Sequence, residues 1–129
     1  MLIQATIAPE TSESTSNIGD MVVPFAAKMS YTFHDLYPNE SIDTDAFTIS
    51  STQDIKLTLV QYPVSGSGGT ANVRYNLMRN GNIVATLSVN KNYTSTNTTL
   101  TFTNAPAGTY YFRIVNQGIP DVDGNGYVN

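Results

Sequence analysis

The 129-residue chain contains no cysteine, which excludes disulfide bonds, thiol chemistry and cysteine-ligated metal sites. Charge is scarce too: only 12% of residues are charged, about half the usual share. Serine, threonine and asparagine supply most of the polarity instead. Because this composition is typical of exported bacterial β-proteins, we expect a secreted or cell-surface protein.

Positive charge is especially sparse, with six lysines and arginines and a net charge of −4. The cations are scattered along the chain, whereas nucleic-acid binding needs a concentrated basic surface. No apolar run approaches the roughly 20 residues of a membrane-spanning helix. We therefore expect neither a nucleic-acid partner nor a membrane span.

The first residues predict little regular structure. Met1–Ala8 is apolar but too short for a signal peptide and has no basic flank, so we expect the export signal to be missing from this sequence. Pro9–Asp20 is rich in serine, threonine and glutamate. We expect a flexible or partly ordered lead-in over residues 1–20 and one domain over residues 21–129.

Apolar side chains alternate with polar ones in the remaining chain, as in Ile55, Leu57 and Leu59. A period of two indicates strands with one buried face, as in antiparallel sheets. Asn80-Gly81 predicts a tight hairpin, and Ser65–Gly69 and Pro106–Gly108 predict further turns. Together these signals predict an all-β protein, an antiparallel β-sandwich or barrel.

Several strand segments resemble, in order, the bacterial pre-peptidase C-terminal domain, a β-sandwich found beside secreted peptidases. The similar segments are Asp43–Phe47, Ile55–Leu59, Tyr75–Gly81 and, most closely, Ala107–Ile114 with its Gly-Thr-Tyr-Tyr sequence. Gly126–Asn129 is similar to the short final strand. The resemblance covers about two-thirds of the chain.

The resemblance implies a jelly-roll-like sandwich of two sheets. It also implies an accessory task, either binding a polymeric substrate or assisting secretion, often with calcium. One departure is that Val73–Asn76 lacks the acidic residues that the family often carries there.

Catalytic signals are weak. The single histidine, His34, precedes Asp35, and neighbours on a strand point to opposite faces, so Asp35 is badly placed to orient it. No Gly-x-Ser-x-Gly motif occurs. We therefore expect that the protein is not an enzyme.

Calcium is the expected cofactor if there is one. Asp121, Asp123 and Asn125, followed by Gly126, match the first half of an EF-hand-type loop. The sequence given stops at the ninth position of that loop and so does not include its twelfth, acidic position. The alternative interpretation is a hairpin turn rich in glycine and asparagine.

A second acidic set comprises Asp43 and Asp45, with Glu10, Glu13 and Asp20 upstream. Hard oxygen ligands from several segments would suit calcium. The alternative is that Asp43 and Asp45 accept backbone N–H bonds and cap a turn.

Aromatic residues supply the candidate ligand-binding positions. Tyr111 lies beside Arg113 on the strand face opposite the expected core, and Tyr62 and Tyr93 lie near predicted loops. Exposed tyrosine next to arginine is common in recognition surfaces.

The sequence thus predicts a non-catalytic binding module that acts on a polymer, either protein or polysaccharide, or on a partner protein. The alternative is a free-standing structural protein of a surface or matrix. Its threonine-rich, weakly charged strands would pair with other copies at the sheet edges.

Overall fold

The computed structural model describes residues 3–7, 11–12 and 23–129. Within this part of the chain every regular element is a β-strand, and no helix is long and apolar enough to cross a membrane. The strands are β1 (Gln4–Ile7), β2 (Thr11–Ser12), β3 (Met29–Leu36), β4 (Ser41–Asp43), β5 (Phe47–Ile49), β6 (Gln53–Pro63), β7 (Asn72–Arg79), β8 (Asn82–Asn90), β9 (Tyr93–Ala105), β10 (Gly108–Asn116) and β11 (Val122–Val128).

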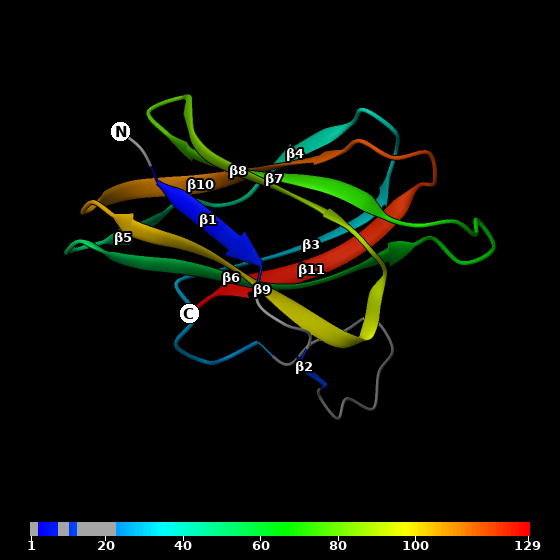
Figure 1. The fold of residues 1–129 in the computed structure, drawn as a ribbon, viewed down its shortest axis with the longest axis horizontal. Helices are drawn as coiled ribbons and strands as arrows, with labels where there is room; N and C mark the ends of the chain where they lie inside the picture. Colours follow the sequence, from blue (N-terminus) through cyan, green and yellow to red (C-terminus); the bar gives the residue numbers. More distant parts are fainter. Residues whose placement is uncertain (1–2, 8–10, 13–22) are drawn as a thin grey trace.

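The strands form two antiparallel sheets that pack face to face (Figure 1). The first has the order β1-β9-β6-β11-β3, with β2 also pairing with β9. The second has the order β4-β10-β7-β8, with β5 also pairing with β10. From β3 onward the chain changes sheet at nearly every connection, and only β4–β5 and the hairpin β7–β8 stay within one sheet. This strand order is that of a jelly roll, which confirms the predicted antiparallel sandwich.

The Asn80-Gly81 hairpin is confirmed. Both residues have positive φ, 53° and 78°, and they join β7 to β8 in a two-residue turn. Asparagine and glycine tolerate this conformation better than other residues, and it matches the twist of the two strands.

The core fills the space between the two sheets. It consists of the alternating apolar residues that the sequence predicted to be buried. Tyr75, Leu77, Tyr110, Phe112 and Leu100 are fully buried. The Phe102 and Phe112 ring centroids, from opposite sheets, lie 5.5 Å apart. Burial of these large side chains supplies most of the driving force for folding.

The polar side chain of Gln61, on β6, is fully buried in this core. Its Nε2 donates to the carbonyls of Val89 and Lys91, at 2.8 and 2.9 Å, and its Oε1 accepts from the Tyr75 hydroxyl at 2.7 Å. Burial raises the pKa of the Tyr75 hydroxyl well above its ordinary value, so this group stays protonated and donates. Gln61 thereby links the first sheet to the end of β8.

The end of the chain differs from the expectation. Residues 122–128 form strand β11, which lies between β3 and β6 and pairs with both. The expected final strand over Gly126–Asn129 therefore begins four residues earlier. Neither the EF-hand-type loop nor the hairpin turn predicted for Asp121–Gly126 exists, because this segment is an extended central strand.

Packing explains the glycines of this strand. Gly124 and Gly126 face the interior opposite Phe33 and Tyr31, whose rings stack with a centroid distance of 6.1 Å. A Cβ on Gly124 would lie 2.6 Å from Phe33 Cζ, and one on Gly126 would lie 2.6 Å from the Tyr31 hydroxyl oxygen. The aromatic rings thus occupy the space that side chains on β11 would need.

Within the expected lead-in, β1 and β2 pair with β9, so the first sheet already includes residues 4–7 and 11–12. The acidic residues Glu10, Glu13 and Asp20 lie outside the described part of the chain.

Candidate functional site

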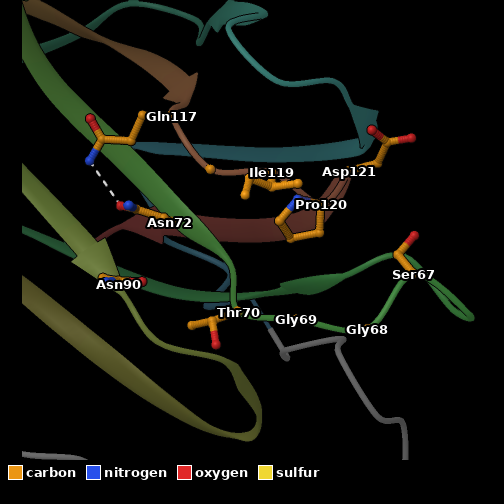
Figure 2. A pocket seen from close by; sticks show the side chains of 11 residues that line it. Ser67, Gly68, Gly69, Thr70, Asn72, Asn90, Gln117, Ile119, Pro120 and Asp121 are labelled. Atoms are coloured by element: carbon orange, nitrogen blue, oxygen red, sulfur yellow. Dashed lines mark hydrogen bonds between the residues drawn. The ribbon is translucent and has the colours of Figure 1, made fainter.

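An open depression of about 750 Å³ lies at one end of the sandwich (Figure 2). It forms where the β6–β7 connection meets the β10–β11 connection, at the end of β8. Its lining residues are Ser67, Gly68, Gly69, Thr70, Asn72, Asn90, Gln117, Gly118, Ile119, Pro120 and Asp121.

Buried Asn116, the last residue of β10, shapes the β10–β11 wall. Its Nδ2 donates to the carbonyls of Leu36 and Pro120, both at 2.8 Å, and its Oδ1 accepts from the Gly118 backbone N–H at 2.9 Å. These bonds hold the connection in a defined path and leave the Ile119 side chain 91% exposed at the rim.

The opposite wall is the glycine-rich β6–β7 connection. Gly68 and Gly69 adopt positive φ, and Gly69 lies against the ring of Pro120. The Asn92 side chain donates to the Gly69 carbonyl at 3.1 Å and accepts from the Ala71 N–H at 2.7 Å. The Ser65–Gly69 segment, which the sequence marked only as a flexible turn, is therefore one wall of the site.

The floor of the depression presents amide groups. Gln117 Nε2 donates to Asn72 Oδ1 at 2.9 Å and to Ser88 Oγ at 2.8 Å (Figure 2). Asn72 and Asn90 are directly opposite each other on β7 and β8. The side chains that line the depression thus offer neutral amides and hydroxyls, one carboxylate at Asp121 and one exposed aliphatic group.

Most polar side chains of this lining are uncharged. Its neutral amides and hydroxyls make directional hydrogen bonds to an uncharged polar ligand. The sequence patterns had not singled out Asn72, Asn90 or Gln117, because their proximity depends on loops that meet only in the fold.

The predicted binding residues Tyr111 and Arg113 lie on the outer face of the second sheet. The Arg113 guanidinium carbon is 6.0 Å from the centre of the Tyr111 ring. Arg113 also forms a two-bond ion pair with Asp43, at 2.8 and 3.0 Å. This pairing holds the pKa of the Asp43 carboxyl below its usual value.

Both carboxylate oxygens of Asp43 therefore accept hydrogen bonds from Arg113, and the alternative interpretation, that Asp43 caps a turn, is wrong. The exposed Asp45 lies between β4 and β5, where its backbone carbonyl accepts from the Thr44 hydroxyl at 3.0 Å. The Asp43 carboxylate is thus held in an ion pair, whereas Asp45 lies exposed between two strands.

The other two predicted binding residues lie elsewhere. Tyr93 lies near a loop, as expected, because it is the first residue of β9, but it is only 5% exposed and belongs to the core. The expectation that it is a surface binding residue is therefore wrong. Tyr62 of β6 is partly buried against the core. The four tyrosine and arginine candidates therefore do not form one site.

The predicted calcium ligands Asp121, Asp123 and Asn125 alternate along or just before β11. Asp123 Oδ1 accepts from the Asp35 backbone N–H at 2.9 Å and lies 3.7 Å from His34 Nδ1. Asn125 is buried. Among the described residues no three acidic or histidine side chains gather as a metal site would require. Calcium binding stays a prediction.

His34 is paired across strands with Asp123 and not with its neighbour Asp35. This agrees with the expectation that Asp35 is badly placed to orient His34. Its side chain is 72% exposed. The pairing depends on the register of β3 against β11, so the local sequence could not indicate it.

No family model matches the chain, and no curated protein matches it. A crystal structure of a protein from Sulfurospirillum deleyianum is similar, with 13% identity, a TM-score of 0.49, and coverage of 78% of this chain and 96% of that one. The class that the fold itself defines is an all-β jelly-roll sandwich.

Proposed function

We propose that the protein is a non-catalytic binding module that holds a segment of a hydroxyl-rich polymer, a polysaccharide, in the end depression. The observation that carries the proposal is the lining, which combines hydrogen-bonded amides with an exposed aliphatic residue, Ile119, around an open space. Sugar rings present both hydroxyl groups and apolar C–H faces, which match these two kinds of surface.

The shape of the site favours a polymer segment over a small enclosed ligand. The depression is open, and its Asn72–Asn90 floor continues along β7 and β8 onto the outer face of the second sheet. A chain can enter and leave such a site, whereas cofactor sites usually enclose most of the ligand.

An accessory role outside the cell is part of the proposal. Low charge, the scarcity of catalytic groups and the resemblance of several sequence segments to pre-peptidase C-terminal domains support it. Calcium modulation through Asp121 and Asp123 belongs to the same proposal and is tested separately below.

Retention on immobilised polysaccharides and proteins tests the proposal. We expect retention of the wild-type chain on one or more polysaccharides and at least tenfold weaker retention of Gln117→Ala, which removes two hydrogen bonds from the floor. Gln53→Ala, a half-buried glutamine on β6 away from the depression, is the control. Equal retention of the two variants, or retention on proteins alone, would refute the proposal.

A further inference from the structure

Arg74 lies one row of side chains from the depression, on the outer face of the second sheet. It is directly opposite Val115 of β10 and Ser88 of β8. Asn72, on the depression floor, precedes Arg74 by two residues on the same strand face, a rise of about 6.6 Å. Ser88 also accepts the hydrogen bond from Gln117 of the floor. Arg74 is therefore a direct neighbour of the residues that form the floor of the depression.

Among the described residues Arg74 has no ion-pair partner, and its Nε is buried without a hydrogen-bond acceptor. Buried polar atoms in native proteins are nearly always bonded, so such a donor is unusual. The other arginine of this face, Arg113, is neutralised by Asp43. One positive charge thus remains next to the depression, in a chain with a net charge of −4.

We propose that the polysaccharide bound in the depression is acidic, and that the Arg74 guanidinium binds the carboxylate of a sugar that extends onto the sheet. This inference rests on the proposed function and names the class of its ligand. Asp121 at the far side of the depression accepts hydroxyl hydrogens and repels a carboxylate. The two charges therefore set the direction in which the chain lies.

The floor favours an acidic polysaccharide over an acidic peptide. Asn72, Asn90 and Gln117 offer neutral donors and acceptors for hydroxyl groups. In addition, the half-buried Tyr111 ring lies on the same outer face, where a sugar ring can stack on it. An acidic peptide needs several cations, and Arg74 is the one cation of this face without an ion-pair partner among the described residues.

Matched polymers test the inference. Polygalacturonate, alginate and hyaluronan are each compared with their carboxyl-esterified forms, which keep the sugars and remove the charge. We expect the wild-type chain to bind at least one acidic form about tenfold more tightly than its ester, with a preference that weakens as salt increases. Arg74→Gln should abolish the preference, so that the acidic form binds no more tightly than its ester.

Lys56→Gln is the control, because it makes the same charge change on an exposed residue of the other sheet. Circular dichroism and thermal melting of each variant exclude misfolding as the cause. Equal binding of acidic and esterified forms, unchanged in Arg74→Gln, would overturn the inference and leave the proposed function standing. Retention of no polymer overturns both. Tighter binding of poly-glutamate than of any polysaccharide would assign the arginine to an acidic protein and also overturn the inference.

Discussion

The ring of Phe33 occupies the space directly above Gly124, so closely that a Cβ there would lie 2.6 Å from Phe33 Cζ. This contact crosses from the edge strand β3 to the central strand β11. It accounts for a glycine in a central strand, where glycine otherwise weakens a sheet.

Gly124→Ala should therefore destabilise the protein by about 1–3 kcal/mol, as overpacking of a core does. Urea unfolding measures the change. Phe33→Leu combined with Gly124→Ala should be more stable than the sum of the two single changes predicts, because the smaller side chain vacates the contested space. Strict additivity of the two changes would contradict this account.

Gln61→Leu should destabilise the protein by more than the small change in side-chain size suggests. The change leaves the Val89 and Lys91 carbonyls and the Tyr75 hydroxyl without their partner inside the core, at a cost of about 3 kcal/mol or more. Gln53→Leu, on the same strand but half-buried, should change the free energy of unfolding by less than about 1 kcal/mol. Similar effects of the two substitutions would show that the buried hydrogen bonds contribute little.

The ion pair between Asp43 and Arg113 predicts a small pH dependence. Because Arg113 lowers the pKa of Asp43 in the folded protein, the pair adds stability at pH values above the ordinary carboxyl pKa. That increment is lost as the pH falls through the lowered native pKa. Both side chains are more than one-third exposed, so solvent screening keeps the effect small.

Unfolding of the wild type and Asp43→Asn at pH 6 and at pH 2.5 checks this. The stability difference should be present at pH 6, shrink in 1 M salt and be smaller at pH 2.5 than at pH 6. Asp45→Asn, which removes a carboxylate that has no ion pair with any described residue, should show no such difference. A difference that grows on acidification would have the wrong sign.

Calcium binding is tested by melting temperature. A calcium concentration ten times the dissociation constant should raise Tm by about 4 °C, because a ligand of the native state stabilises it by mass action. Asp123→Asn should reduce the shift if β11 holds the ion, and Asp43→Asn should reduce it if the ion lies at the β4 end. Identical melting in calcium and in chelator would exclude both sites.

The sequence indicated much of the fold because its signals are local. Alternation in Ile55–Leu59 and Tyr110–Ile114 predicted the strands and their buried faces, and Asn80-Gly81 predicted the hairpin. The strand β11 was misjudged for a physical reason. Alternating aspartate, asparagine and glycine favour turns, and only the rings of Tyr31 and Phe33 make them suitable for a strand.

The candidate site was harder to predict from the sequence than the fold was. Asn72, Asn90 and Gln117 come from three strand ends, and the register of β7 with β8 and the path set by Asn116 bring them together. The same holds for the proposed ligand contact at Arg74, which is next to the depression only through cross-strand pairing.

Composition and periodicity alone therefore determined the all-β class and several of the strands, since these depend on residue type and neighbours along the chain. The tertiary structure alone decided where β11 lies, which tyrosines are buried, which acid pairs with which cation, and where the loops leave an open depression. Those properties depend on contacts between residues tens of positions apart, such as Asp43 with Arg113, and local patterns carry no information about them.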